Sequence, residues 1–492
     1  MGRPDYRGAR GSNAGDDFHE LWALRQALRL LDHQTELYAM TVEGVQLEDK
    51  NLASDSWDGV DCALYFNGRS LETSTRIDLV QVKYSSADPS KAWTLSRLTA
   101  NSAKKNNNSV LRRIGTAFEE ARKKRSGSAA GIQVELISNQ PFDAAVPSLF
   151  TSVANGAAAS DAAKKARKAA GLTVDQFRSL AKAVEWRQEG SRFSLEEEIL
   201  RTISDWTEGD ARPILNDLLA FMRRLMMPES AREWITEETL LAHFGFSSRD
   251  ALFPCEAQLS HISKIIHRDT SSKTVAAMLE GKKHICLHGV AGCGKTTALQ
   301  EVEALLSVGS QMFVFDCYGG GRYLDADGYR HRDKDAFLQL SNEVAVKLRV
   351  PLFLTRSDGT DYARAFYRRL LKASEALKAS AQGALLVVAV DAADNSITAA
   401  QRMVPAEGSF VHKFVAFEHL PDNVRLLVTA RSGRLDQLQL PNYFHKLEIA
   451  GLTVMRLLNM FRPSGPTLRN PGSTTFITIR TVIRGCSAMP LG

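Results

Sequence analysis

The sequence lacks paired cysteines, long apolar runs and a marked excess of charge of either sign. Its six cysteines include no C-x-x-C pair, which argues against a disulfide framework or a structural zinc site. The longest strongly apolar stretch, 384–390, is far too short to cross a bilayer, and the first residues lack the apolar segment of a signal peptide. We therefore expect a cytoplasmic protein in a reducing compartment, with no membrane partner.

Length and charge set the broad class. The chain has 492 residues, of which 44% are hydrophobic and 24% charged, so its composition is that of an ordinary globular protein. This length predicts about two to four domains. The formal net charge is +6, but five arginines follow Glu448, where no acidic residue occurs, so the rest of the chain is close to neutral. Affinity for nucleic acid must therefore depend on local basic patches.

Hydrophobic patterning predicts an α/β multidomain protein. Residues 1–145 combine a helix at 17–31 with short strands, 146–256 are helical with no strand signal at 155–250, and 257–450 alternate strands with helices. Such alternation is typical of a parallel sheet. The strand-like runs are 38–42, 60–66, 79–83 and 134–137 in the first part, and 285–287, 313–315, 385–390 and 426–428 in the last.

Residues 289–296 read G-V-A-G-C-G-K-T, which matches the phosphate-binding pattern G-x-x-x-x-G-K-[ST]. The glycines let backbone N–H groups turn toward phosphate oxygens, Lys295 can reach the β- and γ-phosphates, and the Thr296 hydroxyl can bind Mg²⁺. An apolar strand precedes the pattern, and an amphipathic helix follows with its positive end toward the phosphates. This context favours nucleotide binding over a chance glycine-rich turn.

Two later strands end in side chains that suit the same nucleotide. The apolar run 385–390 leads into Asp391, with Asp394 three residues on, and a carboxylate at such a strand end can partner the Mg²⁺ of a nucleotide. The run 425–431 ends in Arg431, which could sense the γ-phosphate. The alternatives are a helix cap at Asp391 and a surface ion pair at Arg431. The predicted nucleotide-binding residues are Gly289, Gly292, Gly294, Lys295, Thr296, Thr297, Asp391, Asp394 and Arg431, with Thr296 and Asp391 as metal ligands.

The phosphate loop, the D-A-A-D segment at 391–394 and the T-A-R segment at 429–431 resemble the STAND class of P-loop ATPases. This class includes bacterial antiviral switch proteins and resembles the NACHT proteins of innate immunity. The segment 315–323 also resembles the bacterial members. The resemblance covers about 257–450 and implies ATP and Mg²⁺ as cofactors. Asn395 stands where the class usually has Glu, and an amide cannot take a proton from water, so we expect slow hydrolysis, with ATP binding as the switch.

A second group of residues suggests metal-dependent cleavage of phosphodiesters. Asp61 lies in the strand-like run 60–66, and twenty residues later Gln81 and Lys83 occupy the same face of the next strand. Asp61 and the Gln81 side-chain oxygen could hold Mg²⁺, while Lys83 could orient the attacking water or stabilise the phosphorane. The alternative is a surface Gln/Lys pair on a solvent-facing strand.

This layout resembles the PD-(D/E)xK restriction-endonuclease-like fold, in the Mrr-like variant with Gln in place of the second acid. Residues 11–140 resemble nuclease domains for double-stranded DNA that are fused to bacterial defence proteins. The resemblance implies that Glu20 on the first helix completes the catalytic site, with Glu43 as a weaker candidate, and this choice stays open. The stretch 104–125 has eight basic and two acidic residues, which suits a phosphate backbone or, alternatively, a solvated helix face.

The last 44 residues contain no Asp or Glu and are rich in Thr, Arg, Pro, Gly and Ser. In a STAND protein this region begins the helical lid over the nucleotide. We interpret 451–492 as an aberrant tail that is translated out of frame, in a chain that is truncated at its C-terminus. A C-terminal sensor, with a phage protein as its trigger, would then be missing.

These features predict a restriction-endonuclease-like domain at 1–145, a helical linker at 146–256 and a STAND P-loop NTPase core at 257–450. The predicted protein is an ATP-binding switch in anti-phage defence with a Mg²⁺-dependent endonuclease that acts on double-stranded DNA. The resemblance also implies homo-oligomeric assembly of the full-length form. The alternative is a non-enzymatic, nucleotide-regulated switch or scaffold whose N-terminal domain only binds DNA or protein.

Overall fold

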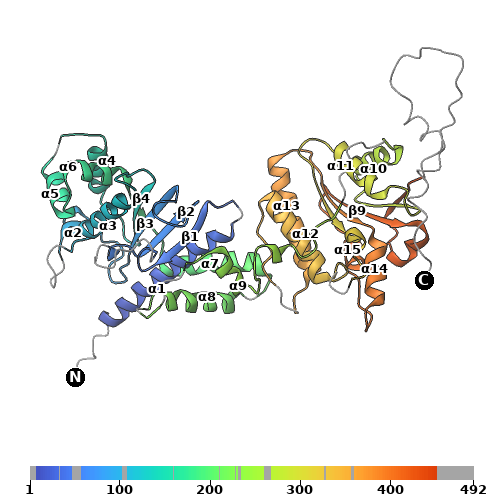
Figure 1. The fold of residues 1–492 in the computed structure, drawn as a ribbon, viewed down its shortest axis with the longest axis horizontal. Coiled ribbons are helices and arrows are strands. Elements are labelled where there is room, and N and C mark those ends of the chain that lie inside the picture. The colour runs from blue at the N-terminus through green and yellow to red at the C-terminus, as the bar shows by residue number, and fades with distance from the viewer. Residues whose placement is uncertain are drawn as a thin grey trace, which may run out of the picture. The chain divides into compact units, whose positions relative to one another are not determined.

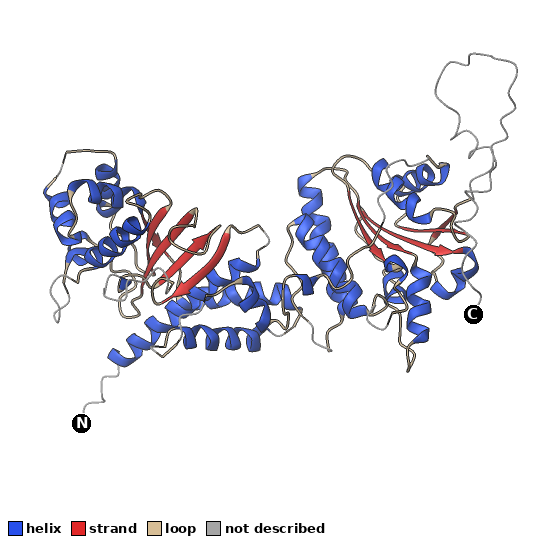
Figure 2. Cartoon of the chain, viewed as in Figure 1, coloured by secondary structure: helices blue, strands red, loops and turns tan. Residues whose placement is uncertain are grey.

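Two five-stranded sheets, each with helices on both faces, make up the fold (Figure 1, Figure 2). The computed structural model describes residues 7–32, 34–46, 57–101, 108–158, 160–209, 211–227, 229–230, 234–259, 267–325, 329–355 and 359–450. The tail predicted at 451–492 lies outside the described residues, as do Lys104 and Lys105 of the basic stretch. Within the described part of the chain, every helix is too short or too polar to cross a membrane.

The first sheet is mixed and has the strand order β1-β2-β3-β4-β5. The pairs β1–β2 and β2–β3 are antiparallel, whereas β3–β4 and β4–β5 are parallel. The elements of this half are α1 (Arg7–Leu28), η1 (Arg29–Leu31), β1 (Leu37–Val42), β2 (Cys62–Phe66), β3 (Arg76–Lys83), α2 (Leu95–Thr99), α3 (Val110–Lys124), β4 (Ile132–Ser138), α4 (Ala145–Ala154), α5 (Asp161–Ala170), α6 (Val174–Ala183), β5 (Val184–Gln188), α7 (Arg192–Thr207), α8 (Ala211–Leu225), α9 (Glu237–His243) and η4 (Asp250–Leu252).

The side chains of β3 alternate between two cores. Ile77 and Leu79 pack with α3, α5 and α6 on one face of the sheet, whereas Val80 and Val82 pack with α1 and α7 on the other. Because successive strand residues point to opposite faces, Gln81 belongs to the α3 face. The predicted helix at 17–31 is present as the C-terminal part of α1 together with η1. It covers the face of the sheet that carries Val80 and Val82.

The prediction that 155–250 contain no strand is wrong. Residues 184–188 form β5, which pairs in parallel with β4 and places Trp186 beside Leu136. Helices α4, α5 and α6 pack into the same core as α3, so they belong to the layers of the first sheet. The sequence signal was weak because β5 has only five residues, of which two are apolar, and it follows α6 without an intervening turn.

The second sheet is wholly parallel, as the alternating pattern predicted, and has the strand order β10-β6-β9-β8-β7. The elements of this half are α10 (Asp269–Leu279), β6 (His284–Gly289), α11 (Lys295–Leu305), β7 (Gln311–Asp316), η5 (Gly319–Gly321), α12 (Asp333–Leu348), α13 (Tyr362–Ser380), β8 (Leu386–Asp391), α14 (Ala393–Arg402), α15 (Phe410–Val415), β9 (Val424–Arg431), η6 (Ser432–Leu438) and β10 (His445–Glu448).

The inner strands β6, β8 and β9 of the second sheet are buried on both faces, which explains their continuous apolar runs. Helices α10 and α11 cover one face, and α12, α13 and α15 cover the other (Figure 1). The register places Gly289 beside Arg431 and Asp316 beside Asp391 at the carboxyl ends of the strands. Polar groups that are far apart in the sequence therefore meet at one edge of this sheet.

Candidate nucleotide-binding and metal-binding sites

The glycine-rich loop between β6 and α11 requires glycine at two positions. Gly292 has φ 74° and Gly294 has φ 86°, a left-handed conformation that side chains disfavour. Gly294 is also the N-cap of α11, so the loop leads directly into the helix. The Lys295 Nζ donates to the carbonyl oxygens of Gly289 at 3.1 Å and Val290 at 3.0 Å, which holds the ammonium over the loop.

Asp391 joins the loop to two strand ends. Its carboxylate is buried and accepts hydrogen bonds from the Thr296 hydroxyl at 2.6 Å and the Thr429 hydroxyl at 2.5 Å. Burial raises the pKa of Asp391, the two hydroxyl groups oppose that rise, and the charge of Asp316 adds to it. The helix-cap alternative for Asp391 is wrong, because the N-cap of α14 is Ala392 and no side chain caps that helix. A buried carboxylate beside a hydroxyl supplies the hard oxygen donors that Mg²⁺ prefers.

Asp394 and Asn395 lie one turn further, at the start of α14. The Asp394 carboxylate is 1% exposed; its Oδ2 lies 3.6 Å from Arg431 Nε and 3.4 Å from Arg434 Nη1. The arginine predicted to sense phosphate is therefore paired with a buried acid at the cavity, and not at the surface as in the alternative reading. The buried Oδ1 of Asn395 has no hydrogen-bond partner. An unpaired amide oxygen here can accept a hydrogen bond from water but cannot act as a base.

A cavity of about 560 Å³ brings most of the predicted residues together. Its walls include Gly292, Lys295, Thr296, Asp391, Asp394 and Arg431, whereas Gly289, Gly294 and Thr297 do not line it. The other lining residues are Gln258, Leu259, Ala291, Asp316, Tyr318, Gly320, Ala392 and Asn395. The cavity thus has the Lys295 ammonium, the Arg431 guanidinium, and the Thr296 hydroxyl and Asp391 carboxylate as hard oxygen donors, beside a glycine loop. Together these groups suit a nucleoside triphosphate with Mg²⁺.

Arg268 and Glu301, which carry no recognisable motif, support the phosphate loop from behind. Arg268 Nη1 donates to the carbonyl of Cys293 at 2.5 Å, and its backbone N–H donates to Glu301 of α11 at 2.9 Å. A Cβ at Gly294 would come within 2.5 Å of Arg268 Nη2, so this glycine is required by packing as well as by φ. The two residues are 33 positions apart, and the sequence offers no signal for their contact.

Asp316 at the end of β7 was also missed. Its carboxylate accepts the backbone N–H groups of Tyr318 at 2.8 Å, Gly319 at 3.1 Å and Gln258 at 3.1 Å. Asp316 therefore fixes the loop after β7 and the segment at Gln258 as walls of the cavity. A signal existed, because Asp316 ends an apolar strand as Asp391 does.

In the first half, the structure brings Asp61 and Lys83 together at the ends of β2 and β3. Asp61 Oδ2 accepts the backbone N–H of Val82 at 2.6 Å and lies 3.7 Å from Lys83 Nζ. Burial lowers the pKa of Lys83, the charge of Asp61 opposes this, and the charge of Arg113 adds to the lowering. Gln81 is 1% exposed, and neither its Oε1 nor its Nε2 has a hydrogen-bond partner. An orphaned amide oxygen beside this pair is suited to a cation or a water.

Glu20 lies elsewhere. It is on α1, which covers the opposite face of the sheet, and both of its carboxylate oxygens accept from Arg223 of α8, at 2.8 Å and 2.6 Å. The Glu20 carboxylate is therefore tied into an ion pair and not directed to Gln81. Glu43 is connected to the pair through the backbone: its N–H donates to the Asp61 carbonyl at 2.7 Å. Burial lowers the pKa of Lys83, and the charge of Glu43 is one of those that oppose this lowering. Among the described residues no three His, Cys, Asp or Glu side chains gather as a metal site.

The basic stretch beside this site is partly neutralised within the domain. Arg122 pairs with Glu119 at 2.9 Å, and Lys123 pairs with Glu120 at 2.7 Å. Arg125 donates to two backbone carbonyls, one of them that of Ser74 at 2.8 Å. Three of the basic side chains predicted to face a phosphate backbone are thus held by partners in the fold, which weakens that prediction.

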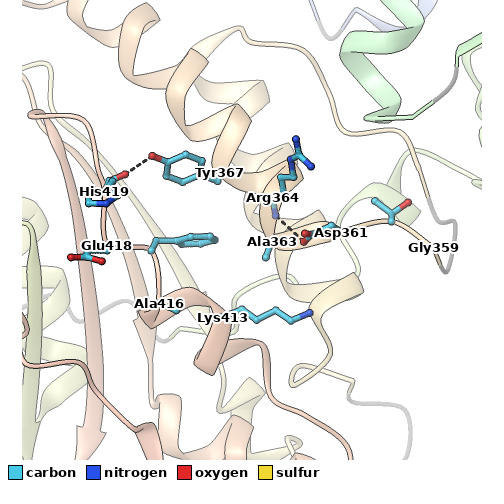
Figure 3. Close-up of a pocket in the computed structure, with 11 residues that line it drawn as sticks. Gly359, Asp361, Ala363, Arg364, Tyr367, Lys413, Ala416, Glu418 and His419 are labelled. Atoms are coloured by element: carbon cyan, nitrogen blue, oxygen red, sulfur yellow. Dashed lines mark hydrogen bonds between the residues drawn. The ribbon is translucent and has the colours of Figure 1, made fainter.

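A second, larger cavity of about 870 Å³ lies between the start of α13 and the segment that follows α15 (Figure 3). There the Tyr367 hydroxyl donates to the carbonyl of His419, and the Asp361 side chain caps α13 by accepting the N–H of Arg364 (Figure 3). Its lining includes Lys413, Phe417 and Glu418 but none of the predicted site residues.

Comparisons with known proteins add little. No family model matches the chain, and no curated protein matches it. Among solved structures, the chain is similar to the Walker-type ATPase of Pyrococcus abyssi, with 18% identity and a TM-score of 0.24. The match covers 36% of this chain and 49% of the archaeal chain, so it spans about half of that protein. The class is defined by fold and site: an α/β protein with a mixed sheet and a parallel sheet, the latter consistent with a P-loop NTPase domain.

Proposed function

We propose that this chain binds ATP with Mg²⁺ in the cavity at the end of the second sheet and acts as a STAND-type nucleotide switch. The observation that carries the proposal is the hydrogen-bonded group of Thr296, Asp391 and Thr429, which joins three segments at the glycine loop. Lys295 and the loop N–H groups would hold phosphate oxygens. Thr296 and Asp391 would hold Mg²⁺, which when bound neutralises phosphate charge.

We further propose that hydrolysis is slow. Asp394 is engaged by two arginines, and Asn395 offers an amide oxygen where a general base would be needed. A water held by Asn395 would be oriented without being deprotonated, so the bound triphosphate would persist. ATP binding, more than turnover, would then set the state of the protein.

The Mg²⁺ dependence of ATP affinity tests this site. Wild type should bind ATP more tightly with Mg²⁺ than with EDTA. Thr296→Val keeps the shape of the side chain but removes the hydroxyl, so the ratio of ATP affinities with Mg²⁺ and with EDTA should be about tenfold smaller than in wild type. Thr274→Val is a matched control, because the Thr274 hydroxyl donates to the Thr270 carbonyl within α10 and does not line the cavity. Equal Mg²⁺ effects in all three proteins would refute the assignment.

A second candidate function is favoured by the group of Asp61, Gln81 and Lys83. We propose a Mg²⁺-dependent endonuclease acting on double-stranded DNA, as an effector in anti-phage defence that the nucleotide state of the oligomer controls. Asp61 and the orphaned Gln81 oxygen would hold Mg²⁺, and Lys83, whose pKa burial lowers, would orient the water or meet the developing phosphorane charge. The alternative remains a domain that only binds DNA or protein.

Plasmid cleavage distinguishes these possibilities. Supercoiled plasmid with protein, Mg²⁺ and ATP should be nicked or degraded by wild type and by Lys164→Ala, whose exposed ammonium pairs with Asp161 on α5. Lys83→Ala should reduce cleavage about a hundredfold. Equal cleavage by wild type and Lys83→Ala would reject the catalytic assignment. Plasmid retardation on a gel without cleavage by any of them would favour the binding-only alternative.

A further inference from the structure

Two arginines share one buried carboxylate at the edge of the nucleotide cavity. Asp394 Oδ2 is 3.6 Å from Arg431 Nε and 3.4 Å from Arg434 Nη1, and both distances are long for a charge-assisted hydrogen bond. Arg431 lines the cavity, whereas Arg434 does not. The two side chains are about one-third exposed, while Asp394 is 1% exposed. Asp394 thus contacts two cations. Arg431 lines the cavity and can reach a ligand there, whereas Arg434 lies outside the cavity.

A buried carboxylate strongly resists losing its only counter-charge. If Arg431 turned its side chain to a phosphate, its backbone N–H would still donate to Asp394 Oδ1 at 3.3 Å. Arg434 would also remain, because its Nη1 is anchored by the Thr398 hydroxyl at 3.1 Å. The carboxylate would therefore keep a cation and a hydrogen-bond donor after Arg431 left.

We propose that Arg434 is a positioning residue that releases Arg431 to the terminal phosphate of ATP by taking over the charge of Asp394. The proposal rests on the proposed binding of ATP at this cavity. It makes discrimination between a triphosphate and a diphosphate depend on a residue outside the cavity. Without Arg434, Asp394 keeps Arg431, and the γ-phosphate loses its partner while the β-phosphate contacts at Lys295 are unchanged.

The test compares the affinities of the non-hydrolysable ATP analogue AMP-PNP and of ADP, measured by titration calorimetry with Mg²⁺. Arg434→Ala should weaken AMP-PNP binding about tenfold and change ADP binding less than about twofold. Arg434→Lys should recover most of the lost affinity. Arg402→Ala, which removes an exposed arginine at the other end of α14, is the matched control and should leave both affinities unchanged.

The double variant separates positioning from folding. In Asp394→Asn the acid no longer holds Arg431, so adding Arg434→Ala to that background should leave AMP-PNP affinity within about twofold. Equal weakening of AMP-PNP and ADP by Arg434→Ala, or the same tenfold loss in the Asp394→Asn background, would overturn the proposal. Failure of wild type to bind either nucleotide would instead reject the proposed function, and the inference with it.

Discussion

The two sheets place polar residues at strand ends in the same way but organise them differently. At the second sheet, hydrogen bonds of 2.5–2.6 Å join Thr296, Asp391 and Thr429, and the first two of these residues line a cavity. At the first sheet, Asp61 Oδ2 lies 3.7 Å from Lys83 Nζ, and neither polar atom of the Gln81 amide has a hydrogen-bond partner. The parallel sheet brings every strand end to one edge, whereas the mixed sheet brings only neighbours together. The residues of the proposed nucleotide site are therefore connected to one another, whereas in the candidate nuclease site Gln81 is not connected to the other two.

The largest expected effect is at the proposed nucleotide site. Asp391→Asn removes the buried charge. In the wild type the Thr296 and Thr429 hydroxyls both donate to the carboxylate, so in the variant one of them would face an amide nitrogen, which cannot accept a hydrogen bond. The increase in ATP affinity on adding Mg²⁺ should fall about a hundredfold or be lost. Calorimetric titration with Mg²⁺ and with EDTA measures this change.

Asp436→Asn is the control for Asp391→Asn, because Asp436 is exposed on η6. It should leave the Mg²⁺ effect intact. If Asp391→Asn and Asp436→Asn gave the same Mg²⁺ effect as wild type, Asp391 would not be a partner of the metal, and the contrast between the sheets would disappear.

A smaller effect is expected from the two glutamates considered for the first site. Glu43→Gln should reduce plasmid cleavage about tenfold, because it removes a carboxylate charge that acts on Lys83. Glu20→Gln should leave cleavage unchanged but lower the free energy of unfolding by about 1–2 kcal/mol, since it breaks a two-point contact with the half-exposed Arg223. Cleavage assays and urea denaturation of both variants provide the comparison. The reverse pattern would restore Glu20 as the residue that completes the site.

The last expected effect concerns the pH dependence of stability and should be similar in the two halves. Burial raises the pKa of Glu135 on β4 and of Glu343 on α12 from 4.5 to about 7. Between pH 4.5 and 7 the folded state then binds more protons than the unfolded state, so the free energy of unfolding falls as the pH rises. Glu135→Gln and Glu343→Gln should each remove about 1–3 kcal/mol of that decline.

Urea denaturation at pH 5 and pH 8 measures that decline. Glu303→Gln, at an exposed position on α11, is the matched control. Wild-type and variant curves with the same pH dependence would show that neither carboxyl is perturbed in the folded protein.

Patterns along the chain predicted eight of the ten strands that the structure describes and most of the polar residues at their ends, because strand patterning and motif spacing are local properties. They did not predict β5 or β10, because these strands have only five and four residues, too few for a clear hydrophobic pattern. Nor did they place Glu20, whose partner Arg223 is 203 residues away. The supporting contacts of Arg268 and Arg434 are likewise tertiary, and no spacing in the sequence encodes them.

The central claim is that the glycine loop and its lysine bind ATP, and direct measurement of ATP affinity tests it. Wild-type protein titrated with ATP and Mg²⁺ should show saturable binding with one site per chain. Lys295→Ala should weaken it at least about a hundredfold, because the ammonium that faces the β- and γ-phosphates is lost. Lys446→Ala, on the edge strand β10, should bind as wild type does. Equal ATP affinity of wild type and Lys295→Ala, or no binding by wild type, would contradict the account.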